Sequence, residues 1–233
     1  MEELRANENK KLEIEVGEKV YYRYAIPTHY VQIGEDYIEI VKKYVQPHYK
    51  EGDILSISEK IIALCQERVV YKKDMKVGFL AKLLCKFAMK SDAGVGVDCP
   101  HKMQFAIDLC GPIKVIFAAI MSGIGKLFGK RGIFYSIVGM EVTGLDGFYD
   151  KVFPEYGEFG IRIPENPTGV CNEIEEKLGI KCMIVDANDI ERTVLGKADS
   201  IEKTNEFLEK LIEDNPAGQS RQLTPFILIR KKH

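Results

Sequence analysis

Residues 52–64, GDILSISEKIIAL, contain the clearest change of pattern in the chain. The first half, from Ile54 to Ser58, is typical of a buried strand opened by a Gly-Asp turn. The apolar residues at 61, 62 and 64 instead have helical spacing, with Ser58 as the expected N-cap. The stretch therefore predicts a strand that passes directly into a helix, with Ser58, Glu59 and Lys60 at a junction where an anion can bind.

Further strands and helices are predicted on both sides of this stretch. Strands are expected at 19–26, 133–142, 181–185 and 225–230, and helices near 35–45, over 75–90, from Pro100, from Pro112, from Pro167 to Gly179, and after Asp199 and Glu202 as caps. The segment 144–167 is rich in Gly, Pro, Tyr and Glu and is predicted to be a long loop. Because neither a repeat nor a linker interrupts the chain, we expect one domain over 1–233, with 1–15 as a polar N-terminal extension.

The apolar residues of three helices are predicted to face the core. The 13-residue run 113–125 is interrupted by Lys114 and falls short of the ~20 residues that span a bilayer, so it too is assigned to the core. The expected core positions are Leu80, Leu83, Leu84 and Phe87 in the first helix, Ile113, Ile116, Phe117, Ile120, Ile124 and Leu127 in the second, and Val170, Ile174 and Leu178 in the third.

Composition narrows the class of protein. The chain has 33 Lys and Arg against 35 Asp and Glu, so no overall charge attracts it to nucleic acid or to an anionic membrane, and neither is expected as a partner. Six cysteines are scattered without a C-x-x-C pair, which favours reduced thiols over disulfides or a zinc site. The charged N-terminal stretch lacks the apolar core of a signal peptide, so a cytoplasmic location is expected.

A glycine-rich segment, 123–132, contains a local group of cations. Its spacing matches neither G-x-x-x-x-G-K nor G-x-G-x-x-G, so a Walker or Rossmann phosphate loop is not supported. Lys126, Lys130 and Arg131 remain as a cluster that can face phosphates, an acidic substrate or nucleic acid, or can simply be the solvated end of a helix.

Carboxylates at the ends of predicted elements are the candidate metal ligands. Asp98 follows Gly94-Val-Gly-Val, and Asp186 and Asp189 follow a predicted buried strand. Two such groups brought together supply the oxygen ligands that Mg²⁺ and Mn²⁺ prefer, whereas each alone is also a common turn or cap residue. The four histidines form no hydrolase motif.

Three segments, in order, resemble one known family. They are residues 52–70, GDILSISEKIIALCQERVV, the AGVGVD element at 93–98, and IPENP at 163–167 followed by a helix and CMIVD at 182–186. Together they are similar to the γ-glutamyl ligases that act on the deazaflavin coenzyme factor 420, with order and spacing matched over about residues 25–200.

The resemblance implies an α+β fold with mixed or antiparallel sheets, an intertwined homodimer, and GTP-driven ligation of L-glutamate to a small-molecule carboxylate. By position, Lys60 would be catalytic and contact phosphate together with Ser58 and Asn188; Asp98, Asp186 and Asp189 would hold Mg²⁺ or Mn²⁺, with Asp199 nearby. Cys99-Pro100-His101 and Ala187-Asn188 depart from the family pattern beside the two main aspartates. The alternative is a non-catalytic nucleotide- or metal-binding protein that kept the fold.

Overall fold

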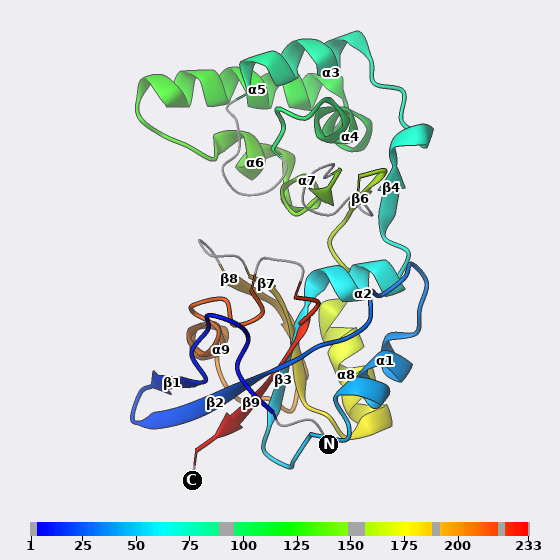
Figure 1. Cartoon of the computed structure of the whole chain (residues 1–233). Helices are drawn as coiled ribbons and strands as arrows, with labels where there is room; N and C mark the ends of the chain where they lie inside the picture. The colour runs from blue at the N-terminus through cyan, green and yellow to red at the C-terminus, as the bar shows by residue number, and fades with distance from the viewer. Residues whose placement is uncertain (1–3, 89–95, 149–156, 188–191, 219–221, 233) are drawn as a thin grey trace. The chain divides into compact units, whose positions relative to one another are not determined.

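The chain divides into two compact units in the computed structural model. The structure describes residues 4–88, 96–148, 157–187, 192–218 and 222–232. Unit 1 comprises Met1–Glu67 and Pro164–His233, and unit 2 comprises Arg68–Ile163 (Figure 1). Unit 2 is inserted in the chain between the two segments of unit 1, a division that the single predicted domain does not include.

Unit 1 is built on a six-stranded sheet with the order β1-β2-β9-β3-β7-β8. β3 and β7 run parallel, and the other neighbouring strands run antiparallel, so the sheet is mixed. This arrangement confirms the predicted α+β class with mixed and antiparallel sheets. The strands are β1 (Glu13–Val16), β2 (Lys19–Ile26), β3 (Ile54–Ser58), β7 (Cys182–Ala187), β8 (Arg192–Lys197) and β9 (Phe226–Lys231).

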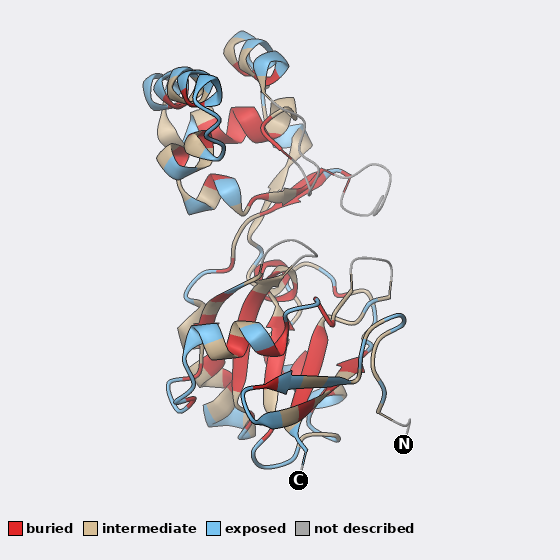
Figure 2. Ribbon diagram, turned by 90° about the vertical axis from the view of Figure 1, so that its left-hand side faces the viewer, coloured by how far each residue is buried: buried red, intermediate tan, exposed pale blue. Residues whose placement is uncertain are grey.

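Helices cover both faces of this sheet. Figure 1 shows α1, α2 and α8 on one face and α9 on the other. The core lies between these layers, where the central strands are almost entirely buried (Figure 2). The helices are α1 (Tyr37–Tyr44), α2 (Glu59–Cys65), α8 (Pro167–Leu178) and α9 (Asn205–Leu211).

The helix ends show how local sequence fixes these boundaries. The Asn166 side chain accepts a hydrogen bond from the Gly169 amide at 3.1 Å and caps α8, while Gly179 ends it with a φ of 70°. The predicted core residues Val170 and Ile174 are buried and Leu178 is partly buried. These features confirm the predicted helix.

The start of α9 differs from its prediction. The Thr204 hydroxyl accepts a hydrogen bond from the Phe207 amide at 3.3 Å and caps the helix, so Asp199 and Glu202 are not its caps. The predicted apolar residues are nevertheless in the core: Ile201, Leu208, Leu211 and Ile212 are all buried.

The N-terminal segment, predicted to be a polar extension, is hydrogen-bonded to unit 1. The Ala25 amide donates to the Arg5 carbonyl at 2.9 Å. The Asn7 side-chain amide donates to the Ala217 carbonyl at 2.8 Å and to the Thr224 hydroxyl at 2.9 Å. From Glu13 onward the chain already forms β1.

Unit 2 consists of helices around α4 and a small antiparallel sheet with the order β4-β6-β5. α3 and α5 both pack on α4, and α6 packs on α5. Because β5 and β6 fall within 144–167, the prediction of a continuous loop there is wrong. The elements are β4 (Val69–Tyr71), η1 (Lys72–Asp74), α3 (Phe79–Leu84), η2 (Cys85–Phe87), α4 (Pro100–Cys110), α5 (Pro112–Leu127), α6 (Ile133–Val138), α7 (Met140–Thr143), β5 (Asp146–Gly147) and β6 (Phe159–Ile161).

The predicted strand at 133–142 is also wrong, because this segment forms α6 and α7. Gly132, with a φ of 79°, precedes α6, and Gly139, with a φ of 96°, separates the two helices. Short apolar runs do not by themselves distinguish a strand from a buried helix. Glycines in conformations that other residues rarely adopt set the helix boundaries here.

The orientation of α5 overturns the predicted core face. Its large apolar residues point outward, with exposed fractions of 84% for Ile113, 54% for Phe117 and 83% for Leu127. The buried residues are the small ones, Val115, Ala118 and Gly125. In α3 and η2, Ala81 and Cys85 are buried. Of the predicted core residues there, Leu80 and Leu84 are partly buried, whereas Leu83 is 39% and Phe87 73% exposed.

The described residues contain no helix that is both long enough and apolar enough to cross a bilayer.

Candidate functional site

The strongest candidate site lies at one edge of the unit 1 sheet. β3 and β7 are parallel neighbours, and their register places Ser58 beside Val185, so both strands end at the same edge. The next residues along the chain are Glu59, which begins α2, and Asp186, the second-last residue of β7. The carboxyl ends of parallel strands are where α/β sheets usually bind ligands.

The antiparallel neighbours complete this edge. β8 starts there, with Thr193 paired to Asp186, and β9 starts there, with Phe226 paired to Ile57. The Pro225 carbonyl accepts a hydrogen bond from the Ser58 amide at 2.9 Å. Four strand ends therefore hold the backbone around the Ser58 and Asp186 positions.

The strand-to-helix junction has the predicted boundaries. Ser58 is the N-cap of α2 with an extended backbone, but among the described contacts its hydroxyl accepts no bond from the first helical turn. Glu59 is only 5% exposed, and Lys60 is half-buried. Successive helical residues point about 100° apart, so these two side chains leave the junction in different directions.

Asp186 is half-buried and follows an irregularity in the sheet. The pairing of β7 with β8 shifts register between Ile184 and Val185, which leaves Leu195 as an extra residue in β8. Such bulges locally bend a strand and change the direction of nearby side chains. In the part of the chain that the structure describes, the Asp186 carboxylate makes no ion pair.

Asp98, the other main candidate ligand, belongs to unit 2. It is half-buried in the turn that precedes α4. The neighbouring Val97 amide donates to the Tyr135 hydroxyl at 3.2 Å. Burial raises the pKa of Tyr135, and the negative charge of Asp98 raises it further, which indicates that these groups lie close together.

The remaining predicted residues have different outcomes. Asn188 and Asp189 lie outside the described residues. Asp199 follows the far end of β8, where the Ala198 amide bonds to the Cys182 carbonyl at the start of β7. It is therefore about four strand residues, on the order of 13 Å, from Asp186, and the prediction that it lies nearby is wrong. Its carboxylate instead accepts a hydrogen bond from the Asn172 side chain at 2.7 Å.

The chemistry of the edge is compatible with a divalent cation held largely by other oxygens. Mg²⁺ typically uses one or two protein carboxylates and takes its remaining ligands from water and substrate phosphates. Asp186 is such a carboxylate, and Lys60 lies half-buried in the first turn of α2, directly after the neighbouring strand β3. Across the described ranges, no group of three or more His, Cys, Asp or Glu residues is placed to hold a metal.

Sequence reasoning identified the ends of both strands but missed two features of the site. One is the burial of Glu59, which no sequence feature indicates, because Glu is usually exposed. The β3–β7 pairing joins residues more than 120 positions apart in the chain and has no local signature.

Comparisons with known proteins add no assignment: no family model matches the chain, and no curated protein matches it.

Proposed function

We propose that this protein is a metal- and nucleotide-dependent acid–amino-acid ligase of the γ-glutamyl ligase type, with its nucleotide-phosphate site at the Ser58 and Asp186 sheet edge. The observation that carries the proposal is the parallel β3–β7 register, which puts the Lys60 junction beside Asp186. The three sequence segments that resemble the ligase family include both sides of this edge.

The proposed reaction has two steps. An oxygen of the substrate carboxylate attacks the γ-phosphorus of GTP; the bond to the bridging oxygen breaks, and GDP leaves. The amine of L-glutamate then attacks the acyl-phosphate carbon, the C–N bond forms, and phosphate leaves with the C–O electron pair while the amine loses a proton to water. Phosphorylation is required because an unmodified carboxylate has a poor leaving group.

Named residues have distinct tasks in this scheme. Lys60 binds the transferred phosphoryl group and offsets the negative charge that accumulates on it. Asp186 would hold a Mg²⁺ or Mn²⁺ ion, which would supply positive charge against the phosphates. Ser58 contacts the nucleotide. The roles that the family resemblance implies for Asn188, Asp189 and Asp98 stay predictions, because the first two lie outside the described residues and Asp98 belongs to unit 2.

Two further expectations belong to this proposal. The family resemblance favours a homodimer, which light scattering after size-exclusion chromatography measures directly. A cytoplasmic location is supported by six cysteines without a disulfide, since thiols persist in reducing compartments.

Thermal stability with nucleotide and metal tests the binding part of the proposal. GTP with Mn²⁺ should raise the melting temperature, because a ligand that binds only the folded state stabilises by about 2.7 kcal/mol at a hundredfold excess over its Kd. Asp186→Asn should remove the metal-dependent shift. Asp199→Asn is the matched control at the opposite edge of the sheet and should keep it.

Phosphate release tests the catalytic part. The ligase hypothesis predicts phosphate release from GTP that depends on both L-glutamate and a carboxylate substrate and that is lost in Lys60→Gln. A metal-dependent nucleotide shift without release in a screen of carboxylates would favour the non-catalytic alternative. No shift with GTP or ATP would refute the proposed site.

A further inference from the structure

A row of large apolar side chains is exposed on unit 2. On α5 they recur at the spacing of one helical stripe, and the segment 79–87 adds three more at every fourth residue. We call this surface the apolar crest; its members are Phe79, Leu83, Phe87, Ile113, Ile116, Phe117, Ile120, Ile124, Leu127 and Phe128, with exposed fractions between 38% and 84%. Soluble proteins rarely expose contiguous apolar patches of this kind without a binding role.

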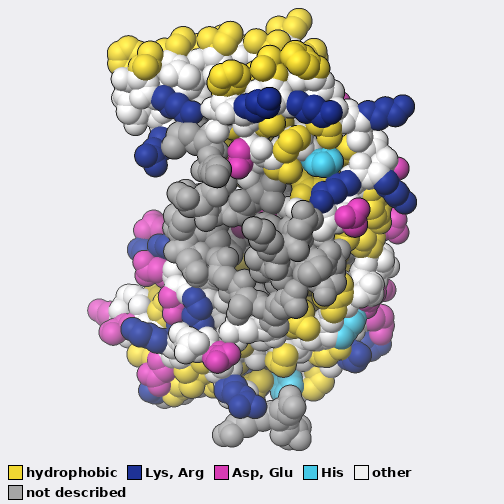
Figure 3. Space-filling model, turned by 45° about the horizontal axis from the view of Figure 1, so that its top comes forward, with side chains coloured by type: hydrophobic (Ala, Val, Ile, Leu, Met, Phe, Trp, Pro, Cys, Tyr) yellow, Lys and Arg dark blue, Asp and Glu magenta, His cyan; other side chains and the backbone are white. Residues whose placement is uncertain are grey.

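The crest is a consequence of how the helices pack. α3 and α5 both lie on α4 and present their outer faces on the same side of unit 2. The inner stripe of α5, with Val115, Ala118 and Gly125, is small enough to satisfy the packing against α4 and α6. The large residues of the outer stripe are therefore left partly or mostly exposed, and Figure 3 shows apolar side chains gathered along this face.

Exposed cations border the crest. Figure 3 shows a row of Lys and Arg side chains directly below the apolar band. The segments that carry the crest also carry six exposed cations, which we call the basic belt: Lys82, Lys86, Lys114, Lys126, Lys130 and Arg131. The sequence contains no Asp or Glu in 75–88 or in 109–140, so the belt is not neutralised by its own segments.

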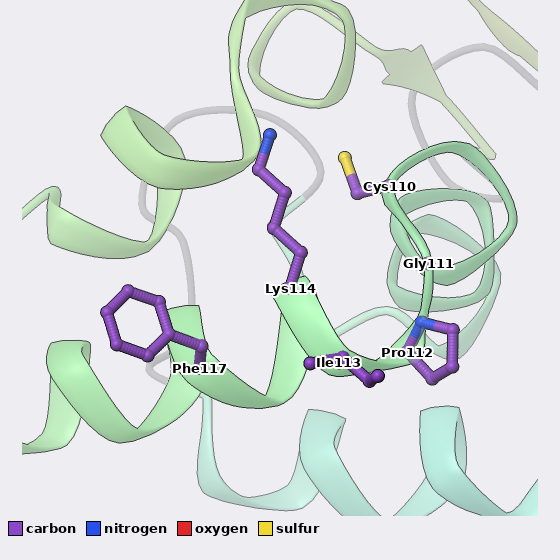
Figure 4. A pocket seen from close by; sticks show the side chains of 6 residues that line it. All are labelled: Cys110, Gly111, Pro112, Ile113, Lys114 and Phe117. Atoms are coloured by element: carbon purple, nitrogen blue, oxygen red, sulfur yellow. The ribbon is translucent and has the colours of Figure 1, made fainter.

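An open hollow lies on this surface. A shallow depression of about 520 Å³ lies at the α4–α5 connection and is lined by Cys110, Gly111, Pro112, Ile113, Lys114 and Phe117. Figure 4 shows Lys114 and Phe117 leaving α5 in different directions, so the cation and the apolar ring serve different parts of the surface. An open apolar depression beside an amine suits a broad apolar binding partner that carries negative charge at its boundary.

We propose that the apolar crest and the basic belt together bind the surface of an anionic lipid bilayer. An interfacial helix inserts an apolar face at the headgroup boundary while Lys and Arg at its flanks contact anionic lipids. Lysines tolerate such a boundary because their apolar stems lie along the surface and their amines reach the headgroups. α5 has 16 residues, about 24 Å, which suits a helix lying in the boundary.

Charge separates this occupant from the other candidates. A symmetric dimer through the crest would bring two identical basic belts together, which opposes association. A nucleic acid would pair with the belt but would leave the ten large apolar side chains in water. An anionic bilayer matches both the apolar crest and the basic belt. The near-zero net charge, from which no membrane partner was expected, is a sum over the whole chain and does not describe this local group of cations.

Sedimentation of the full-length protein with lipid vesicles tests the proposal. The protein should bind vesicles that contain phosphatidylserine and bind pure phosphatidylcholine vesicles much less. The double variant Phe117→Ser/Ile120→Ser should lower the partition coefficient by about tenfold or more, since each side chain loses its apolar transfer term. Met140→Ser removes a side chain that is 57% exposed on α7, outside the crest, and should leave binding unchanged.

A charge series separates the belt from the crest. Lys126→Glu/Lys130→Glu should weaken binding to anionic vesicles, and the weakening should shrink as salt screens the belt. Lys19→Glu/Lys42→Glu makes the same charge change on unit 1 and should have little effect. Because all four positions are exposed, melting temperatures close to that of the parent protein should accompany these results.

Three outcomes would overturn the proposal. Vesicles of both compositions could fail to retain the protein. The serine variant could convert a dimer to a monomer without changing vesicle binding, which would assign the crest to a second copy. RNA could displace the protein from vesicles, with the control variant Lys19→Glu/Lys42→Glu losing as much vesicle binding as the belt variant. That result would assign the cations to non-specific charge attraction.

Discussion

Removal of the Asp53 carboxylate should destabilise unit 1 by about 3 kcal/mol. Asp53 is 2% exposed and lies just before β3, at the end of the strand opposite to Ser58. It accepts hydrogen bonds from Arg230 Nε at 2.9 Å, from Arg230 Nη2 at 2.6 Å and from the Lys50 amide at 2.8 Å. The two bonds from Arg230 tie the start of β3 to β9, and the bonded Asp53 carboxylate raises the pKa of Arg230.

The magnitude follows from what Asp53→Ala would leave behind. Breaking a buried ion pair by removing one partner typically costs about 3–5 kcal/mol, since the remaining charge is uncompensated. Arg230 is 18% exposed and keeps a hydrogen bond to the His48 carbonyl at 2.9 Å, which favours the lower end of that range. A loss of about 3 kcal/mol is a large share of the stability of a typical domain.

Urea unfolding followed by far-UV circular dichroism and tyrosine fluorescence measures this loss. The chain has no Trp, so tyrosine emission is the intrinsic probe. Lys42→Ala is the control, because the Lys42–Glu39 pair is exposed and should be worth at most about 0.5 kcal/mol. A loss below about 1 kcal/mol for Asp53→Ala, with an unchanged m-value, would contradict the assigned role of the buried pair.

Two other predictions concern packing and pH. Gly196→Ala should destabilise unit 1 by about 1–3 kcal/mol, because the new methyl group would lie 2.5 Å from the Thr168 amide nitrogen. Gly123→Ala meets nothing within 4 Å and should stabilise α5 by about 0.5–1 kcal/mol. Thermal melts of both variants measure the contrast. Burial opposes ionisation of Asp214, but hydrogen bonds from Arg23 lower its pKa, so its stabilising effect should be present above the unfolded-state pKa of about 3.9 and disappear as pH falls through the lower folded-state value. Asp214 is 40% exposed, so Asp214→Asn should lose less than about 1 kcal/mol at pH 7 and nothing at the acid end; equal losses in urea titrations at both ends would refute the linkage.

Local signals predicted the elements that depend on them. The change of period within 52–64 correctly placed β3 and α2, and Asn166, Pro167 and Gly179 correctly bounded α8. The same approach failed at 133–142, where the apolar run was too short to define a period and the glycines at 132 and 139 set helix ends instead. Caps and glycine conformations are local features, so they allow helix ends to be predicted where the hydrophobic periodicity already identifies a helix.

The arrangement of the candidate site depends instead on strand pairing between distant parts of the chain. Ser58, Lys60 and Asp186 each followed from a local motif, but their shared sheet edge depends on the pairing of β3 with β7. The antiparallel pairing of β7 with β8 separates Asp199 from Asp186, because β8 carries the chain back to the other edge. Proximity in the sequence after β7 therefore predicted the wrong neighbour, and strand direction decides which carboxylates share a site.

The inverted face of α5 connects the packing of unit 2 to its proposed surface role. Both stripes of the helix are apolar, so periodicity alone identified a face without showing which side it would cover. Size decides between them: Val115, Ala118 and Gly125 allow α5 to approach its neighbours closely, and the bulkier Ile and Phe side chains remain outside. A helix that faced the core with its bulky stripe would expose an unremarkable surface of small residues between lysines. The observed orientation instead exposes Ile and Phe in the same segments as exposed Lys and Arg, the combination found on interfacial membrane helices.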